Sequence, residues 1–351
     1  MLAHICCSVD SCYFLKRLRE IMPDEEITGF FYNPNIHPYS EYKLRFLDVK
    51  RDCQKQGIGL IEGEYSPENW LENVKGLECE KERGKRCEVC FEMRLEVTAK
   101  KAKELGEKSI TTTLFMSPKK SFEQLSAAAD KISLKWEIEV LCFDFRKKCG
   151  TQEQFALAKE KRLYRQNYCG CIYALLDQRE AQKRVCGELL NPIGKEILPS
   201  SIEERLEFYK KVDEYEKSGI DFALKREKFQ NYRLLWGRIL NESGDILPSW
   251  FLGAYDGIFE AVVENIDDGY GFAKDTLFIE LWRFNKMVNY SYKNVKELIF
   301  NPPENEKQNN IRVKFPDYPL FIVIDSVKTG TYKIEARSTF YEDVREVLAI
   351  L

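Results

Sequence analysis

Short β-type runs alternate with amphipathic helical stretches through the first half of the chain. The runs at 2–6, 27–32, 58–61, 109–115 and 137–143 predict strands, and the stretches at 41–56, 90–105, 122–132 and 152–163 predict helices. This alternation is typical of an α/β domain built on a parallel sheet. Loops at the carboxyl ends of parallel strands meet at one edge of the sheet. We therefore expect the functional site at that edge.

The chain of 351 residues is longer than one compact core usually requires. Asn191-Pro192 and the Leu-Pro-Ser-Ser run at 198–201 predict a linker. The sequence thus predicts a catalytic α/β domain at 1–190 and a smaller, mixed α+β domain at 200–351. In the second domain we expect helices at 202–216 and 222–238 and β-like runs at 311–315, 320–324 and 332–337.

The sequence has no apolar run of the roughly 20 residues that a membrane span requires, and no basic leader at its start. We therefore expect a cytoplasmic protein without a membrane partner. The net charge of −3 gives no overall footprint of a nucleic-acid-binding protein.

Twelve cysteines are present in this large, core-rich chain, which favours a metal or redox role over a disulfide scaffold. Cys53, Cys142 and Cys186 lie in apolar or helical surroundings and are expected to be buried as small hydrophobes. Three cysteine pairs stand where a loop meets the end of a helix or strand. They are Cys6 and Cys7 with Asp10 nearby, Cys87 and Cys90, and Cys169 and Cys171.

Thiolates are the preferred ligands of iron–sulfur clusters and of zinc. Six paired cysteines and Asp10 are more ligands than one zinc ion or one cubane cluster needs. This surplus predicts either a cluster with a second metal beside it or a cluster with separate redox-active thiols. A four-cysteine zinc site remains the alternative.

Basic and aromatic residues interleave at helical spacing in the segment 225–238. Such a pattern is typical of a helix that faces RNA. An ordinary amphipathic helix that packs Phe229, Tyr232 and Trp236 inward gives the same pattern.

The first half of the chain contains several distinctive motifs. They are His4-x-Cys6-Cys7, the run from Gly84 to Leu95 with its Cys-x-x-Cys, Thr111-Thr112-Thr113-Leu114, Asp144-Phe145-Arg146, and Tyr164-Arg165-Gln166-Asn167-Tyr168-Cys169-Gly170-Cys171. Together these motifs resemble the QueH family of epoxyqueuosine reductases. The resemblance covers most of residues 1–185. It implies an adenine nucleotide alpha-hydrolase-like fold, a 4Fe–4S cluster with iron, and reduction of the epoxide of epoxyqueuosine in tRNA to give queuosine.

The first loop departs from the family pattern, which usually reads Cys-Cys-x-Pro-Cys. Here Asp10 stands where the third cysteine would be, and Cys12 follows two residues later. A carboxylate can ligate iron. We therefore expect Asp10 to join the cysteines as an oxygen ligand, with Cys12 as the alternative.

Removing the epoxide oxygen requires two electrons, which a cofactor must carry. No Gly-x-Gly-x-x-Gly follows the first strand, so a Rossmann-type flavin or nicotinamide has no support. We expect the cluster to pass electrons singly from an external donor and an adjacent mononuclear iron to act as Lewis acid. Asp10, Tyr164 or a thiol would supply the proton.

The candidates for binding an extruded nucleotide, by stacking or by phosphate contact, are Tyr32, Arg146, Tyr164 and Arg165. A tRNA sulfur-transfer or nucleotide-activating enzyme of the same fold is a competing interpretation. It is disfavoured because the loop after the first strand lacks the glycines that cradle pyrophosphate. A zinc-stapled tRNA-binding module is the non-enzymatic alternative.

Overall fold

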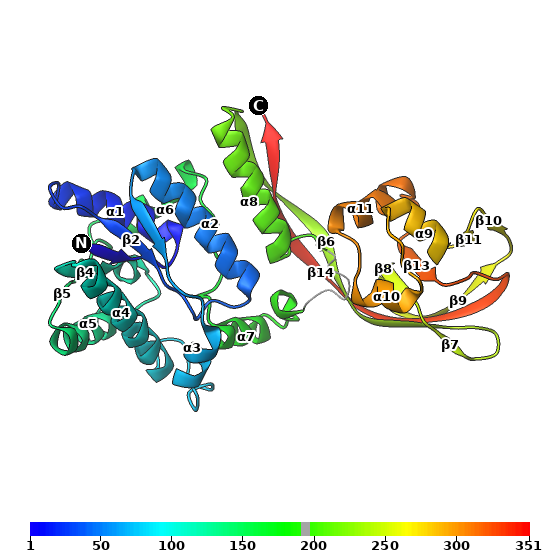
Figure 1. Cartoon of the computed structure of the whole chain (residues 1–351), viewed down its shortest axis with the longest axis horizontal. Coiled ribbons are helices and arrows are strands. Elements are labelled where there is room, and N and C mark those ends of the chain that lie inside the picture. Colours follow the sequence, from blue (N-terminus) through cyan, green and yellow to red (C-terminus); the bar gives the residue numbers. More distant parts are fainter. Residues whose placement is uncertain (191–196) are drawn as a thin grey trace. The chain divides into compact units, whose positions relative to one another are not determined.

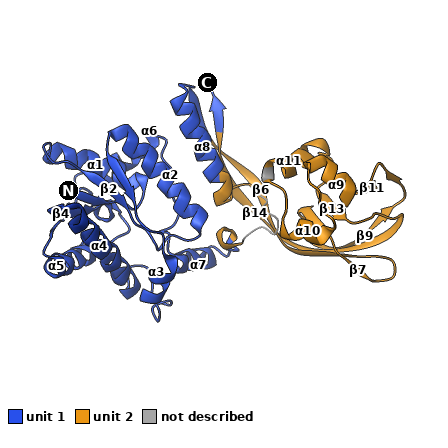
Figure 2. Cartoon of the chain, viewed as in Figure 1, with its two compact units in different colours: residues 1–186, 205–224, 348–351 blue, residues 187–204, 225–347 orange. Residues whose placement is uncertain are grey.

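The computed structural model describes residues 1–190 and 197–351, which form two compact units (Figure 2). Unit 1 comprises residues 1–186, 205–224 and 348–351, and unit 2 comprises residues 187–204 and 225–347. Asn191 and Pro192 of the predicted linker lie outside the described residues. The helix expected at the start of the second domain, α8 (Ile202–Lys217), belongs to unit 1 from Arg205 onward.

Unit 1 contains a five-stranded sheet in the order β3-β2-β1-β4-β5, and every neighbouring pair is parallel. Its strands are β1 (Leu2–His4), β2 (Thr28–Phe31), β3 (Gly59–Glu62), β4 (Ser109–Thr112) and β5 (Glu139–Leu141). All five strands lie where the sequence predicts them. The end of the fourth predicted run forms a 3₁₀ turn, η1 (Thr113–Met116), instead.

Helices cover both faces of this sheet (Figure 1). They are α1 (Ser8–Ile21), α2 (Tyr39–Gln56), α3 (Pro67–Asn73), α4 (Lys85–Leu105), α5 (Phe122–Trp136), α6 (Gly150–Glu160) and α7 (Ile172–Ala181). Helices α1, α2 and α6 pack together on one face, while α4 and α5 pack on the other. The predicted parallel α/β fold class is thus confirmed.

The strand order places a topological switch point between β1 and β4. From β1 the chain proceeds outward to β2 and β3, and it then returns to β4 beside β1. In open parallel sheets, ligands bind outside the carboxyl ends of the strands at such a point. The central strand β1 is completely buried, which fixes the loop that follows it against the core.

Unit 2 contains two sheets. One has the order β10-β11-β12-β13-β8 and the other the order β7-β6-β14-β9. The strands are β6 (Phe222–Leu240), β7 (Ile246–Leu247), β8 (Trp250–Gly253), β9 (Gly257–Val263), β10 (Ile266–Asp267), β11 (Tyr270–Ala273), β12 (Thr276–Glu280), β13 (Leu320–Ile324) and β14 (Gly330–Ile350). Between β12 and β13 lie α9 (Leu281–Val288), α10 (Val295–Phe300) and α11 (Asn305–Lys314). The 3₁₀ turn η2 (Gly187–Leu189) comes at the beginning of this unit.

Two apolar cores hold unit 2 together. Buried side chains of β6, β9 and β14 meet one face of β12 and β13, so the two sheets pack against each other. Side chains of α9, α10 and α11 meet the opposite face of the five-stranded sheet. The unit is therefore a mixed α and β layer structure, with helices on one outer side.

Two predicted elements of unit 2 are wrong. The segment 222–238 forms the strand β6 instead of a helix, because β14 provides a long partner strand far away in the sequence. The run 311–315 lies at the end of α11 instead of in a strand. There the buried Gln308 and Ile311 are three residues apart, which is helical spacing.

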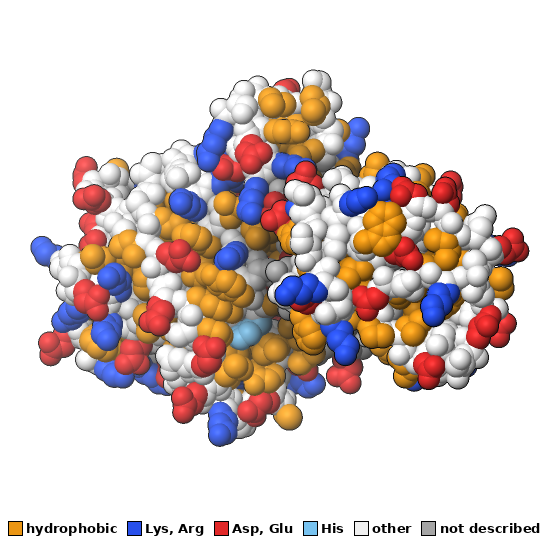
Figure 3. All heavy atoms as spheres, turned by 45° about the vertical axis from the view of Figure 1, so that its right-hand side comes forward, with side chains coloured by type: hydrophobic (Ala, Val, Ile, Leu, Met, Phe, Trp, Pro, Cys, Tyr) orange, Lys and Arg blue, Asp and Glu red, His pale blue; other side chains and the backbone are white. Residues whose placement is uncertain are grey.

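No helix in the two described ranges is long and apolar enough to cross a lipid bilayer. The face of the molecule in Figure 3 mixes hydrophobic, basic and acidic side chains.

Candidate metal centre

The first cysteine loop leaves β1 at its carboxyl end and runs directly into α1. Cys6 and Cys7 lie in this loop, and Asp10 lies in the first turn of α1. The Sγ of Cys6 is 3.9 Å from the Sγ of Cys7 and 3.4 Å from Oδ2 of Asp10. Within the described residues, this is the one group of three or more His, Cys, Asp or Glu side chains whose ligand atoms all lie within 4.8 Å of one another. Two thiols and a carboxylate suit a transition metal such as iron or zinc.

Gln154 is a fully buried residue of α6 that contacts this group. Its Nε2 donates to Oδ1 of Asp10 at 2.6 Å, while its own Oε1 has no hydrogen-bond partner among the described residues. Burial raises the pKa of Asp10, and hydrogen bonds from Cys6, Cys7 and Gln154 oppose this rise. A buried carboxylate beside two thiols is costly to ionise without a cation. The group therefore fits a bound metal ion.

Cys12, the alternative to Asp10, has a different environment. Its thiol donates to the carbonyl oxygen of Val9 at 3.4 Å, and it does not belong to the group of three ligand side chains. Burial raises the pKa of Cys12 to about 12, as expected for an inert buried thiol. The structure thus brings Asp10, and not Cys12, beside Cys6 and Cys7.

The other two cysteine pairs come together near Lys120. Cys87 and Cys90 lie in the first two turns of α4, and Cys169 and Cys171 immediately precede α7. The Nζ of Lys120 donates to Sγ of Cys169 at 2.9 Å. Burial alone would raise the pKa of Cys169, but the charge and hydrogen bond of Lys120 outweigh burial and lower it. Cys90 and Cys171 share a small apolar cluster.

Lys120 is within electrostatic reach of both cysteine groups. Its ammonium favours the charged forms of Cys87 and of Asp10, although burial raises the pKa of each. The loop that carries Lys120 is held by Arg146, whose Nη1 donates to the Lys120 carbonyl oxygen at 2.9 Å. Arg146 in turn pairs with Asp144 at 3.0 Å. A buried cation beside several thiols stabilises thiolates and suits a thiolate-held cluster.

Tyr164 supports the last cysteine loop. Its hydroxyl donates to Glu41 at 2.9 Å, and burial raises its pKa. Glu41 also pairs with Arg45, which donates to the carbonyl oxygens of Tyr168 and Cys169, each at 3.0 Å. The contacts of Tyr164 are therefore those of a residue that positions the loop.

Gly170 fits this loop because of its backbone and its surroundings. Its φ is +109°, and an added Cβ would lie 2.8 Å from Ile36 and 3.2 Å from Arg45. A larger residue would be strained and would displace the flanking cysteines.

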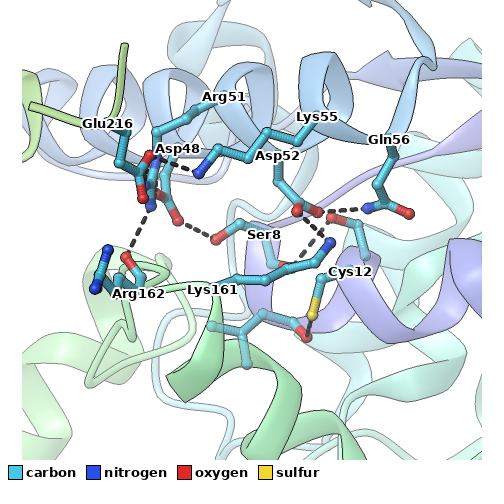
Figure 4. A network of polar contacts seen from close by, with 12 residues as sticks. Ser8, Cys12, Asp48, Arg51, Asp52, Lys55, Gln56, Lys161, Arg162 and Glu216 are labelled. Carbon is cyan, nitrogen blue, oxygen red and sulfur yellow. Dashed lines mark hydrogen bonds and ion pairs between the residues drawn. The ribbon is translucent and has the colours of Figure 1, made fainter. Parts of the chain in front are cut away.

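Asp48 contacts both the first and the last cysteine loops. Figure 4 shows it beside Ser8 and Arg51. This buried carboxylate accepts hydrogen bonds from the Ser8 hydroxyl and from the backbone N–H of Tyr164, the latter at 2.8 Å. Arg51 pairs with Asp48 at 2.6 Å and with Glu216 of α8 at 2.8 Å. The network thus joins both cysteine loops to α8.

The remaining predicted contact residues lie in different settings. Arg165 is exposed, and its guanidinium lies 4.5 Å from the ring centroid of Phe155. Tyr32 is buried and stacks on Phe30, and its carbonyl oxygen lies 3.0 Å from a ring nitrogen of His4. Tyr32 is therefore a core residue.

Five residues that support the site were not predicted from the sequence. They are Glu41, Arg45, Asp48, Lys120 and Gln154. The first three occur at spacings of four and three residues in α2, so they form one charged stripe of that helix. Such a stripe is usually solvated, and only the structure shows that it is buried. Lys120 and Gln154 carry no local signal.

Comparison with known proteins gives matches over the whole chain. A family model described as epoxyqueuosine reductase QueH matches residues 1–177. An epoxyqueuosine reductase QueH of Helicobacter pylori is 39% identical over 363 aligned residues, which cover 98% of each chain.

Two further relatives match about half of the chain. The epoxyqueuosine reductase QueH of Haemophilus influenzae is 36% identical over 56% of this chain and 79% of its own length. That of Thermotoga maritima is 37% identical over 53% of this chain and 95% of its own length.

Among solved structures, the U34-tRNA thiolase NcsA from Methanococcus maripaludis with its [4Fe-4S] cluster gives a TM-score of 0.33 at 13% identity. That alignment covers 61% of this chain and 72% of the thiolase. The family match over half of the chain and the full-length relative agree with each other and with the motifs of the cysteine loops. The chain belongs to the epoxyqueuosine reductase QueH family.

Proposed function

We propose that this protein reduces the epoxide of epoxyqueuosine in tRNA to the alkene of queuosine. The observation that carries the proposal is the group of Cys6, Cys7 and Asp10 beyond the carboxyl end of β1, with a second group of cysteines beside Lys120, in a chain of this family. Loss of the epoxide oxygen consumes two electrons and two protons and releases water. An external electron donor must therefore supply the reducing equivalents.

The two cysteine groups have different roles in this proposal. A 4Fe–4S cluster would be held by cysteines among Cys87, Cys90, Cys169 and Cys171, and it would supply electrons one at a time. A mononuclear iron would be held by Cys6, Cys7 and Asp10, whose mixed sulfur and oxygen donors suit this metal.

The surrounding side chains stabilise the charge of these ligands and orient them. Lys120 offsets the negative charge that several thiolates bring into a buried site. Gln154 orients the carboxylate of Asp10, and Glu41 with Tyr164 and Arg45 holds the loop of Cys169. The exposed residue Arg165 is our candidate for a phosphate contact with the RNA.

The test combines metal analysis with turnover on protein purified without oxygen. We expect iron and acid-labile sulfide in the wild type, and conversion of epoxyqueuosine to queuosine in tRNA when a reductant is supplied. Cys87→Ala should lose sulfide and activity, whereas Asp10→Ala should keep sulfide, lose about one iron per chain and lose activity.

Cys79→Ala is the matched control, because Cys79 is exposed and lies outside the three cysteine pairs. It should retain both metal and activity. A colourless wild-type protein that holds only zinc and reduces no epoxide would contradict the proposal. That result would favour a zinc-stapled tRNA-binding module.

A further inference from the structure

The helices α9 to α11 form a basic region in an otherwise acidic unit. Residues 281–315, which contain the three helices, have seven Lys and Arg against three Asp and Glu. The rest of unit 2 has eleven Lys and Arg against twenty Asp and Glu. The positive charge of unit 2 is thus concentrated on the helical side of its five-stranded sheet.

The lysines of this region are not neutralised by carboxylates. Five of them, across the described ranges, have no carboxylate within ion-pair distance, and they are Lys286, Lys293, Lys296, Lys307 and Lys314. The sheet of β6 and β14 differs, because there Arg226 pairs with Glu346 at 3.2 Å and Lys228 with Glu342 at 3.0 Å. The unpaired lysines are therefore concentrated on the helices, whereas Arg226 and Lys228 of β6 are paired.

Aromatic rings lie beneath these ammonium groups. The Nζ of Lys286 lies 4.7 Å from the ring centroid of Trp282. The Nζ of Lys307 lies 4.4 Å from the ring centroid of Tyr290. A cation–π contact orders a lysine without cancelling its charge. Trp282 itself is 42% exposed, so part of its ring remains available for stacking.

The two outer helices place these groups on one continuous surface. Helices α9 and α11 pack against each other and lie side by side in Figure 1. Arg283 of α9 and Lys314 of α11 both lie over the ring of Tyr270, at 5.0 and 5.8 Å from its centroid. Lys286 follows Arg283 by three residues and is therefore its neighbour on the helix surface.

We propose that this α9–α11 face binds the phosphate backbone of the tRNA substrate. Unneutralised lysines interleaved with aromatic rings are complementary to a polyanion with stacking bases. The Thermotoga maritima relative aligns over 95% of its own length to only 53% of this chain. Unit 2 therefore serves a purpose beyond the chemistry that the family shares, and tighter tRNA binding is such a purpose. The inference rests on the proposed function.

Charge reversal tests the proposal in the full-length protein. In the triple variant Lys286→Glu, Lys307→Glu, Lys314→Glu, no ion pair is broken. The affinity for epoxyqueuosine-containing tRNA should fall by about tenfold or more near physiological salt, and the salt dependence of log K should lose about two to three units of slope.

The matched control is Lys225→Glu, Lys274→Glu, Lys328→Glu. These three lysines of unit 2 are exposed, also lack a carboxylate partner among the residues that the structure describes, and lie outside α9–α11. The control changes the net charge by the same amount and should keep nearly wild-type affinity. Equal losses in both variants, or no loss in either, would overturn the proposal. The proposal would also be overturned if the first triple variant bound tRNA normally but no longer bound an acidic protein.

Turnover separates this inference from the proposed function. The first triple variant should lose kcat/KM on whole tRNA but keep it on a short epoxyqueuosine-containing oligonucleotide, which offers few phosphates. If the wild type reduced the epoxide in neither RNA, the proposed function would fail. If the wild type turned over the substrate and the first triple variant kept its tRNA affinity, only the proposal that the α9–α11 face binds tRNA would fail.

Discussion

Asp48 is a single buried carboxylate on which three segments of unit 1 depend. It accepts from Ser8 next to the first cysteine pair and from the backbone of Tyr164, and it pairs with Arg51. Breaking a buried ion pair by neutralising one partner leaves the other charge uncompensated.

We predict that Asp48→Asn lowers the free energy of unfolding by about 3 kcal/mol, because Arg51 stays buried without its closest partner. Urea unfolding measures this change. Glu104→Gln is the control, since the Glu104–Lys101 pair at 3.1 Å is solvent-accessible and should contribute less than about 1 kcal/mol. A similar loss of unfolding free energy in both variants would contradict the role of Asp48 as the buried partner of Arg51.

Gly170 allows a second prediction about a single residue. Gly170→Ala should be strained and should also collide with Ile36, so that the loop of Cys169 and Cys171 shifts and the protein loses bound iron and sulfide. Gly57→Ala is the control, because Gly57 also has a positive φ of 63° but its Cβ would meet nothing within 4 Å.

Gly57→Ala should lower the free energy of unfolding by only about 1 kcal/mol. It should keep its metal. If Gly170→Ala retained full metal content, the tight packing of this loop would not matter for the site.

The strand β6 shows how an element can differ from its local sequence pattern. Its basic and aromatic residues suggest a helix, but β14 provides a hydrogen-bonded ladder and cross-strand carboxylates. Phe, Tyr and Trp are also well suited to strands, and Gly237 is unfavourable in a helix. Pairing over about a hundred intervening residues thus outweighed the local spacing.

The same pairing predicts a small role for the β6 cations in binding. Charge reversal by Arg226→Glu with Lys228→Glu should leave tRNA affinity within about twofold, because carboxylates already neutralise both cations. Filter binding at a fixed salt concentration measures this tRNA affinity. A large loss of affinity would place the RNA on β6 and would contradict the choice of the helical face.

For the whole molecule, the assignment of α8 to unit 1 has a measurable consequence. Tyr209, Val212 and Phe222 are almost completely buried, and Tyr209 packs edge-on against Tyr164 at 5.4 Å. Glu216 of the same segment pairs with Arg51. Residues 205–224 thus complete the core beside the last cysteine loop.

We predict that a fragment of residues 1–224 has a melting temperature well above that of residues 1–190, although both contain the segment 1–177 that matches the family. Removing α8 exposes apolar area worth several kcal/mol and leaves Arg51 without Glu216. Differential scanning calorimetry compares the two. Equal melting temperatures would mean that α8 adds nothing to unit 1.

Three features could be predicted from local sequence patterns: the parallel α/β class, the positions of the five strands of unit 1, and the placement of the cysteine pairs at the ends of elements. Hydrophobic periodicity is local, and a strand followed by a helix has few ways to pack, so these features are encoded within short windows. Asp10 as the neighbour of Cys6 and Cys7 was expected from the family resemblance, because Asp10 stands at the position of the third cysteine in the usual Cys-Cys-x-Pro-Cys pattern.

The support of the cysteine loops, and the places of α8 and β6, depend instead on contacts between distant parts of the chain. Lys120 reaches Cys169 from 49 positions away, and Asp48 reaches Tyr164 from 116 positions away. Such contacts depend on burial and on partners that no sequence window contains. The charged stripe of α2 resembles a solvated surface in sequence, and it became a buried support because the cysteine loop folded over it.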